Sequence, residues 1–186
     1  MGKLVLFIHM SLDGYVAGPG GDIMAFHSGG DDFEAFSAEG SSQVDAILLG
    51  HTTYEMMKAY WPTPEAAASS PEIAHFMNER PKYVVSHQPF EPGWQHVTGI
   101  SGDDVIGDIR KLKTQPGQNI IIFGSNNLCA SLVAAGVLDE LQIMLNSFVF
   151  GGGTPLFEGL SNKMDFRLVN TQQFPSGNLL LSYVPK

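Results

Sequence analysis

The stretch DAILLGHTTYEMM (45–57) decides the fold, because an apolar run ends on Gly50 and a polar His-Thr-Thr follows at once. The run 45–50 predicts a buried strand. The next segment, 52–60, has helical spacing of apolar residues, and Thr52 with Glu55 three positions later has the spacing of a capping box. A strand that passes directly into a helix is the repeating unit of an α/β sheet.

The same alternation runs along most of the chain. Strands are expected at 3–10, 45–50, 82–87, 119–124, 140–150 and 178–184, with a weaker one at 166–174. Helical patterns cover 31–42, 52–60, 70–81, 101–114 and 125–136, and the Pro/Ala/Ser segment 61–71 predicts a surface loop. These patterns indicate an α/β, three-layer fold with a central, mostly parallel sheet and helices on both faces. No helical pattern separates the last strands, so the C-terminal edge is expected to be antiparallel.

Composition favours a single domain over residues 1–186, because 44% hydrophobic residues can form a sizeable core. A net charge of −9 with only 10 Lys and Arg argues against a nucleic-acid surface. No segment approaches the ~18 apolar residues of a membrane span, and the N-terminal apolar run resembles a strand more than a signal peptide. The one cysteine, Cys129, lies in an apolar helical run and is expected in the core. A soluble, cytoplasmic protein is expected.

Two strand-to-helix junctions have the same build. Gly50 is followed by Thr52 and Thr53, and Gly124 is followed by Ser125 and two asparagines. Ligands of open α/β sheets bind beyond the carboxyl ends of the strands, where first-turn N–H groups can hold phosphate. The alternative is that both are ordinary helix N-caps. Two such junctions at one sheet end suggest a pyrophosphate between them, although neither GxGxxG nor a Walker loop occurs.

These residues carry a resemblance to a known fold. The chain resembles the dihydrofolate-reductase superfold, and more closely the branch that contains the C-terminal reductase domain of the riboflavin-biosynthesis deaminase-reductase RibD. The matching pieces are SLDGYVAG (11–18), DAILLGHTTYEMMKAYWP (45–62), YVVS (83–86), IIIFGSNNL (120–128) and LDELQIMLNSFVFGGGTPLF (138–157). They occur in the family's order from one end of the chain to the other.

The resemblance implies NADPH as cofactor and assigns roles to residues of this sequence. The backbone around three residues of the first strand and its following loop would meet the nicotinamide carboxamide: His9, Val16 and Ala17. The first junction would bind phosphate through Gly50, His51, Thr52 and Thr53. The 2′-phosphate would lie by Ser86 and His87. The second junction would close over the pyrophosphate with Gly124, Ser125, Asn126, Asn127 and Leu128.

One departure concerns the phosphate site. Close relatives have arginine where this chain has His51. A neutral imidazole donates one hydrogen bond but lacks the fixed charge and two-pronged geometry of arginine. The departure puts the preference for NADPH over NADH in question.

The substrate side rests on DDFEAF (31–36), which resembles the reductase pattern Asp-x-x-x-Phe. Asp32 would be the catalytic acid and Phe36 would lie against the substrate ring. Two solvated acids at a helix N-terminus are the equal alternative, and Asp31 competes with Asp32. Phe26 and Trp61 are further candidates for the substrate pocket. Phe26 lies in the stretch 23–26, where relatives have IDWF and this chain has IMAF.

The expected function is therefore reduction of a small nitrogen heterocycle. The first hypothesis is an enzyme that resembles 5-amino-6-(5-phosphoribosylamino)uracil reductase. A dihydrofolate or pterin reductase is the enzyme alternative. The third hypothesis is a nucleotide- or pterin-binding module without turnover. A homodimer is expected, because strands after residue 165 have apolar residues on both faces and no helical pattern to cover them. A monomer shielded by loops is the alternative.

Other residues receive simpler interpretations. His27, His75 and His96 lack metal-ligand spacing, so no metal is expected. Asp13 is read as a turn former, and the glycines 151–153 as a tight connection.

Overall fold

The apolar run that ends on Gly50 forms strand β3 (Ala46–Gly50), all of which is buried. The computed structural model describes residues 2–27, 40, 42–115, 119–124 and 126–186. Strand β3 pairs in parallel with β4 (Lys82–Val85) and with β6 (Ile120–Phe123). On the outer side of β4 lies β5 (Val97–Ile100), also parallel. These strands belong to unit 1, one of two compact units, which comprises Met1–Leu4 and Phe33–Ser125.

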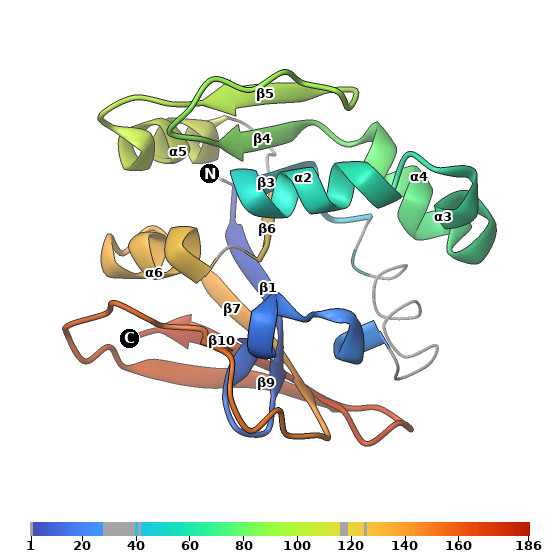
Figure 1. Ribbon diagram of the computed structural model, residues 1–186. Coiled ribbons are helices and arrows are strands. Elements are labelled where there is room, and N and C mark those ends of the chain that lie inside the picture. The colour runs from blue at the N-terminus through green and yellow to red at the C-terminus, as the bar shows by residue number, and fades with distance from the viewer. Residues whose placement is uncertain (1, 28–39, 41, 116–118, 125) are drawn as a thin grey trace. The chain divides into compact units, whose positions relative to one another are not determined.

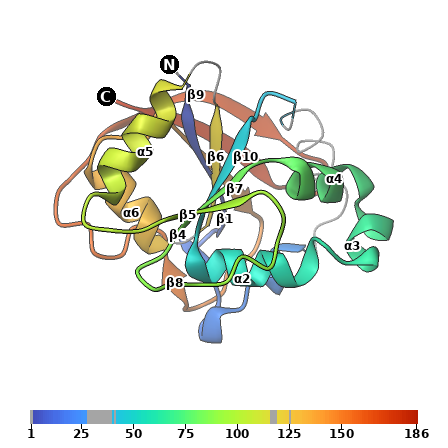
Figure 2. The ribbon, with the colours of Figure 1, turned by 90° about the horizontal axis from the view of Figure 1, so that it is seen from above.

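In the described part of unit 1 the strands are flanked by the helices α2 (His51–Tyr60), α3 (Pro64–Ser69), α4 (Pro71–Glu79) and α5 (Val105–Thr114). Helix α5 lies on one side of the strands, and α2, α3 and α4 lie on the other (Figures 1 and 2). Alternate residues of β3 point to α2 and α4, where Ile47 and Leu49 form a buried cluster with Tyr54, Ile73 and Met77. Parallel strands covered on both faces explain their continuous apolar runs.

Unit 2 comprises Val5–Asp32 and Asn126–Lys186. Its strand β1 (Leu4–Ser11) pairs in parallel with β7 (Glu140–Asn146). Then β10 (Leu179–Pro185) pairs antiparallel with β7, and β9 (Phe166–Gln173) antiparallel with β10. The remaining elements are the ribbon of β2 (Tyr15–Ala17) and β8 (Thr154–Pro155), the short 3₁₀ helices η1 (Pro19–Gly21) and η2 (Met24–His27), and α6 (Asn126–Ala134).

The predicted α/β class is confirmed, with mostly parallel pairing and an antiparallel C-terminal edge. Cys129 is fully buried, and burial raises the pKa of its thiol to about 12. Helix α6 ends before Gly136, which has φ 62° as expected of a residue that follows a helix. None of the helices in the described residues combines the length and apolarity needed to span a bilayer.

Several local expectations are wrong. The segment 61–71 is not a loop, because Thr63 caps α3 by accepting from Ala66 N and Pro64 occupies the first helical position. The capping box at Thr52 is not formed, since α2 begins at His51 and its N-cap is Gly50. Helix α5 begins only at Val105, with Asp104 as its cap.

Strand boundaries also differ from expectation. Strand β7 ends at Asn146, four residues before the end of the predicted run 140–150, and the strands β2, β5 and β8 were not expected. These three are short, with two to four residues, and each is defined by its pairing, β5 with β4 and β2 with β8. Met56, in the helical apolar pattern of 52–60, is 45% exposed.

A buried lysine closes the end of α4. Lys82 is 0% exposed, and its Nζ donates to the carbonyl oxygens of Met77, Asn78 and Arg80 at 2.9, 3.0 and 2.8 Å. The ammonium also lies 4.6 Å from the ring centroid of Trp94. These carbonyls are the groups that the end of a helix leaves without intrahelical partners. Burial lowers the pKa of Lys82 to about 8.

We expect Lys82→Met to lower the free energy of unfolding by about 1–3 kcal/mol, because three buried carbonyl oxygens lose their donor. The measurement is urea denaturation, with Lys163→Met as control, since Lys163 has an 83% exposed side chain. The folded-state pKa lies below the ordinary 10.5, so the unfolded chain binds more protons between about 8 and 10.5, and wild-type stability should rise relative to the variant as the pH increases through that range. Equal stability of the two variants would show that this contact stabilises nothing.

Candidate functional site

The first turn of α2 has no side-chain cap. Its N-cap residue Gly50 is extended, with φ −76° and ψ 155°, and makes no side-chain hydrogen bond. Thr53 in the same turn is 8% exposed, and its hydroxyl has no hydrogen-bond partner in the described part of the chain. An uncapped helix start with a nearly buried hydroxyl is suited to an anion, because the N–H groups and the helix dipole favour negative charge.

Gly124 lies against this turn. It follows β6 with φ 64°, a left-handed conformation that glycine adopts without strain. A Cβ built there would lie 3.3 Å from Thr53 Oγ1 and 3.5 Å from its Cγ2. Unit 1 therefore brings together the two glycine junctions predicted from the sequence, because Gly124 of one lies next to Thr53 of the other.

His51 opens α2 with a side chain that is 40% exposed. Its Nε2 lies 3.7 Å from Glu55 Oε1, and its ring centroid lies 5.5 Å from that of Phe90. Glu55 also forms a 2.7 Å ion pair with Lys58. The carboxylate of Glu55 thus joins two basic groups on the exposed side of α2, and it is not the capping residue expected from its spacing.

Ser86 and His87 follow β4. The Ser86 side chain is 4% exposed, and its hydroxyl donates to Gln88 O at 2.6 Å while accepting from Gln88 N at 3.2 Å. The hydroxyl therefore forms a local turn of its own. His87 is exposed to solvent.

Trp61 is the C-cap residue of α2 and packs against the buried cluster of unit 1. Its carbonyl accepts from Asn78 Nδ2 at 3.0 Å, and its ring lies 5.1 Å from that of Tyr60. These contacts are those of a packing residue, and the substrate-pocket role expected of Trp61 stays a prediction.

Unit 2 places a cluster of rings at the carboxyl end of β1. His9 lies 5.3 Å from Phe7, edge to face, and 5.5 Å from Phe26 between ring centroids. Phe26 is 7% exposed and contacts Phe148 at 5.4 Å and Phe150 at 5.3 Å. We name His9, Phe26, Phe148 and Phe150 the aromatic cluster. The structure thus brings the predicted residues His9 and Phe26 into contact.

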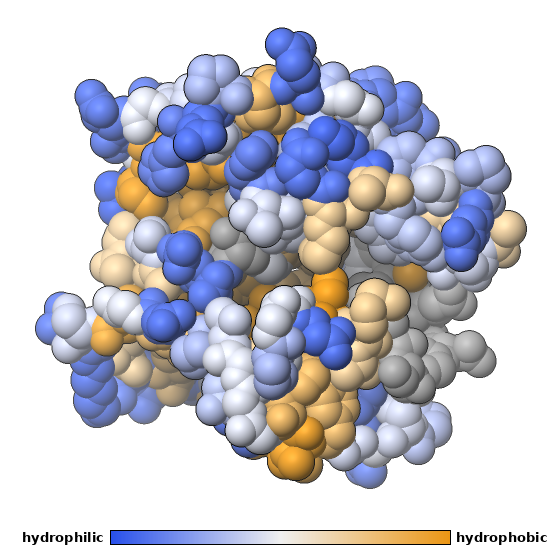
Figure 3. Space-filling model, in the orientation of Figure 1, coloured by the Kyte–Doolittle hydropathy of each residue, from blue (hydrophilic) through white to orange (hydrophobic). Residues whose placement is uncertain are grey.

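The ribbon that carries Val16 and Ala17 is fixed to this cluster by close packing. A Cβ on Gly18 would lie 2.6 Å from the ring of Phe150, and a Cβ on Gly153 would overlap the carbonyl oxygen of Ala17. Both positions therefore require glycine. Figure 3 shows apolar surface gathered at the lower edge of the view. The exposed apolar side chains of unit 2 include Leu12 and Val149.

Asp13 joins the same ribbon to the segment after β7. Its carboxylate accepts from the backbone N–H groups of Phe150 at 3.1 Å and Gly151 at 2.7 Å, and from Ser11 Oγ at 2.7 Å. The hydrogen bond from Ser11 is the main reason that the pKa of Asp13 is lowered. The carboxylate is thus committed to the turn, which confirms Asp13 as a turn former.

The remaining predicted residues are placed by α6 or lie outside the described residues. Asn126 and Asn127 occupy the first turn of α6, and Leu128 is buried at 8% exposure, so only its backbone can meet a ligand. Those that lie outside the described residues are Asp32, Phe36 and Ser125, together with Asp31.

Sequence reasoning missed Asn146, Phe148 and Phe150. The apolar run 140–150 predicts one continuous strand, whereas β7 ends at Asn146. The pattern therefore does not mark the residues beyond Asn146 as a wall of a site. The signal available was the polar pair Asn146-Ser147 that interrupts the apolar run.

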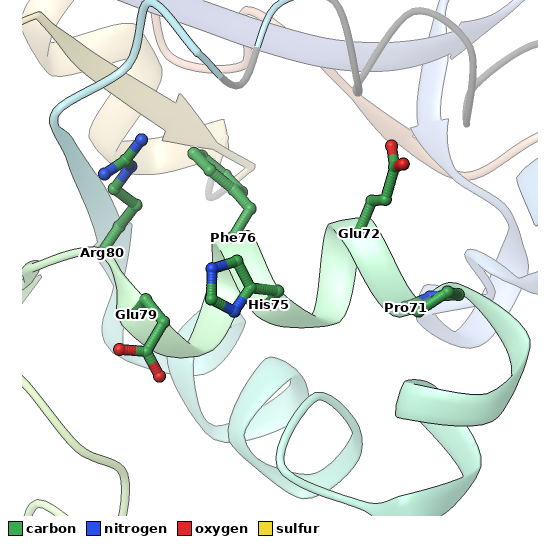
Figure 4. A pocket seen from close by; sticks show the side chains of 6 residues that line it. All are labelled: Pro71, Glu72, His75, Phe76, Glu79 and Arg80. Atoms are coloured by element: carbon green, nitrogen blue, oxygen red, sulfur yellow. The ribbon is translucent and has the colours of Figure 1, made fainter.

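A separate hollow of about 440 Å³ lies along α4 (Figure 4). Its lining residues are Pro71, Glu72, His75, Phe76, Glu79 and Arg80. Figure 4 shows Glu72 and Glu79 pointing to different sides of the helix, so their carboxylates do not converge. Among the described residues no group of three or more His, Cys, Asp or Glu could hold a metal ion.

Comparison with known families decides the identity of the fold. The family model described as RibD C-terminal domain matches residues 2–180. The chain belongs to the RibD C-terminal domain family. Two relatives from Bacillus subtilis (strain 168) match nearly the whole chain: uncharacterized protein YwjB, 32% identical over 176 residues (92% of each chain), and uncharacterized protein YyaP, 28% identical over 185 residues (97% of this chain and 94% of that protein).

Solved structures share the fold of this RibD C-terminal domain. A putative riboflavin biosynthesis protein from Shewanella sp. PV-4 has a TM-score of 0.74 at 22% identity and 99% coverage of both chains. The deaminase/5-amino-6-(5-phosphoribosylamino)uracil reductase of Thermotoga maritima has a TM-score of 0.71 at 18% identity, covering all of this chain and 57% of that one. Dihydrofolate reductase from Enterococcus faecalis, complexed with NADP(H), has a TM-score of 0.64 at 14% identity, covering 100% and 97%. The dihydrofolate-reductase-like fold expected from the sequence is confirmed.

We expect Gly124→Ala to destabilise the protein by about 1–2 kcal/mol, because alanine is strained at positive φ and its Cβ would press on Thr53. Thermal unfolding followed by circular dichroism measures the effect. Gly152→Ala is the matched control, since its φ is not left-handed and a Cβ there meets nothing within 4 Å. If the two variants unfold at the same temperature, the constraint at Gly124 is absent.

Proposed function

We propose that this RibD C-terminal domain is an NADPH-dependent reductase of a small nitrogen heterocycle. The observation that carries the proposal is the uncapped first turn of α2, with the nearly buried Thr53 hydroxyl and Gly124 against it. Family membership supports the reductase class, since a structural relative is named as a uracil reductase and another was solved with NADP(H).

The residues of unit 1 fit the phosphates of such a cofactor. The first-turn N–H groups of α2 and the Thr53 hydroxyl would donate hydrogen bonds to a phosphate. Because Gly124 has no side chain, its backbone would be able to approach the phosphate. His51 and the exposed His87 would each add a donor but no fixed charge. Ser86 would contribute to phosphate binding through the turn that it forms, because its hydroxyl is already hydrogen-bonded to Gln88.

The residues of unit 2 and the segment 31–36 would serve the reacting rings. The backbone around His9, Val16 and Ala17 would meet the carboxamide, and Phe26 would pack on a planar ring. The cofactor, when bound, supplies a hydride. Asp32 would supply or relay the accompanying proton, with Phe36 against the substrate.

Two substrates remain candidates within this class. The first is 5-amino-6-(5-phosphoribosylamino)uracil, which the name of the Thermotoga relative suggests. The second is dihydrofolate or another pterin, which the fold of the Enterococcus enzyme suggests. A phosphoribosyl group would favour a pocket with basic side chains, and the chain has only 10 Lys and Arg. A pterin is therefore kept as the second candidate substrate.

We expect NADPH to bind with a heat signal in calorimetric titration, and Thr53→Val to weaken that binding about five- to tenfold through loss of one hydrogen bond to a charged group. Thr98→Val on the exposed part of β5 is the control and should bind as the wild type does. Titration with NADH in parallel tests whether His51 and His87 still select the 2′-phosphate. Absence of binding by either nucleotide at millimolar concentration would contradict the proposal.

We expect turnover of one of the two heterocycles with NADPH, followed at the absorbance of the reduced nicotinamide. Asp32→Asn should reduce kcat by about 10²-fold or more while NADPH binding is unchanged, as for loss of a general acid. Asp31→Asn tests the competing assignment and should retain activity if Asp32 is the acid. Unchanged turnover by Asp32→Asn would remove Asp32 from the mechanism, and no turnover of either substrate by the wild type would favour a binding module.

We also propose that the protein is a homodimer through the edge of unit 2. In β9 every residue after Phe166 is exposed, and Leu168 and Val169, at an irregularity in the pairing with β10, are 48% and 45% exposed. An exposed strand edge of this length is a site for pairing with another chain. A second copy would cover it by an isologous contact.

Light scattering at micromolar concentration should give about twice the single-chain mass of 20.1 kDa. Leu168→Lys should shift the mass toward that of one chain, because it places a charge at the contact. Leu12→Lys, at a 57% exposed position in another part of unit 2, should leave the dimer intact. A wild-type mass near 20.1 kDa would mean that the edge is exposed in a monomer.

A further inference from the structure

Arg80, the C-cap residue of α4, has a guanidinium without a hydrogen-bond partner. Its Nε atom is buried and makes no hydrogen bond, and within the described residues no carboxylate forms an ion pair with it. Water would satisfy this N–H group on an exposed arginine, and buried polar groups of native proteins are nearly always paired. The Nε–H of Arg80 is therefore a donor whose acceptor lies outside the described chain.

The backbone and a neighbouring ring hold this guanidinium in place. Arg80 N donates to Phe76 O at 3.2 Å, and Arg80 O accepts from Lys82 Nζ at 2.8 Å. The guanidinium carbon lies 5.9 Å from the centroid of the Phe76 ring, within reach of a cation–π contact. Phe76 in turn packs against the buried cluster of unit 1. The unpaired donor is thus presented from a fixed position, which lowers the entropic cost of binding a ligand.

This donor belongs to the hollow along α4. The hollow measures about 440 Å³, within the ~300–1,000 Å³ of small-molecule sites. Figure 4 shows Glu72, Phe76 and Arg80, each four residues from the next, pointing to the same side of the helix. An aromatic ring therefore lies between a basic end and an acidic end of the hollow.

The two acidic residues of the hollow do not neutralise Arg80. Glu72 comes eight residues earlier, which is about 12 Å along a helix axis. Glu79 points to the other side of the helix in Figure 4, and its Oε1 accepts from Gln95 Nε2 at 3.3 Å. The positive charge of Arg80 is therefore available to an external anion.

The chemistry of the lining selects among anions. The edge of a guanidinium that carries Nε–H and one terminal N–H matches the two oxygens of a carboxylate. A phosphate carries up to two charges, which the two glutamates of the hollow and the net charge of −9 disfavour. The Phe76 ring offers a flat apolar surface against which another ring can pack. The lining therefore fits an anion with one carboxylate on an aromatic body.

We propose that the hollow along α4 is a binding site for an aromatic carboxylate, whose carboxylate accepts from Arg80 Nε–H and whose ring packs against Phe76. None of the six residues that line the hollow belongs to the candidate nucleotide site or to the aromatic cluster. The inference is therefore independent of the proposed reductase activity, and its failure would leave that proposal in place.

The site is tested by titrating the full chain with benzoate and following the arginine Nε–H signals in ¹H–¹⁵N spectra. We expect binding at about millimolar concentration, as for a ligand of this size, with a saturable shift of the Arg80 signal. That signal is identified by its absence from Arg80→Lys. Benzamide has nearly the same shape without the charge and should leave the signal in place. Equal shifts with both compounds, or no shift with benzoate, would overturn the proposal.

Two substitutions separate the charge of Arg80 from its planar fork. Arg80→Lys keeps the charge without the Nε–H group, and Arg80→Gln removes both. We expect benzoate binding to weaken about tenfold in Arg80→Lys and further in Arg80→Gln. Arg110→Gln, at an exposed position of α5, makes the same chemical change elsewhere in unit 1 and should bind benzoate as the wild type does. Wild-type affinity in Arg80→Gln would mean that benzoate binds at another place, which contradicts the assignment.

A titration with inorganic phosphate checks the class of ligand. We expect phosphate to shift the Arg80 Nε–H signal less than benzoate does at equal concentration, because phosphate has no ring to pack on Phe76 and carries more charge. A larger effect of phosphate would rule out the carboxylate as the preferred ligand. If Arg80→Gln does not fold, the wild-type titrations with benzoate, benzamide and phosphate still decide.

Discussion

The candidate nucleotide site depends on one constraint, a helix that begins at a residue without a side chain. Because Gly50 cannot cap α2, the N–H groups of its first turn keep no side-chain partner. The same turn carries Thr53, whose hydroxyl lies against Gly124. Gly124 must be glycine for two reasons, its positive φ and the short distance to Thr53. A side chain at Gly124 would press on Thr53 in the first turn of α2.

The rigidity of that turn comes from the polar interior of unit 1. Asn78 on α4 donates to the carbonyls of Trp61 at 3.0 Å and Ala74 at 2.8 Å, and it accepts from Trp94 Nε1 at 2.7 Å. Lys82 closes the end of the same helix from β4. These bonds tie the end of α2 to α4 and to the segment before β5, so the helix start is held by packing at its far end. Buried polar groups of this kind fix one arrangement because each loses its partner if the elements shift.

In unit 2 the aromatic cluster has an equivalent dependence on small residues. Gly18 and Gly153 let the β2–β8 ribbon lie against Phe150 and Ala17, and Asp13 joins the ribbon to the backbone of residues 150 and 151. Phe26 then meets His9 on one side and Phe148 and Phe150 on the other, and the buried Asn146 amide of the neighbouring strand lies 3.3 Å from His9 Nδ1. The cluster thus joins residues 137 positions apart in the chain.

The sequence by itself determined the α/β class, the order of the long strands, the two glycine junctions and the family, because apolar periodicity and glycine placement are local signals. It did not determine α3, the cap of α2 or the short strands β2, β5 and β8, since a local pattern cannot say which of several caps forms or which segment finds a partner strand. Only the tertiary structure decided that Ser86 is bonded to Gln88, that Trp61 packs on the core and that Asn146 faces His9. Each of these depends on the distance between groups far apart in sequence or on competition for one hydroxyl, and neither quantity is written in residue order.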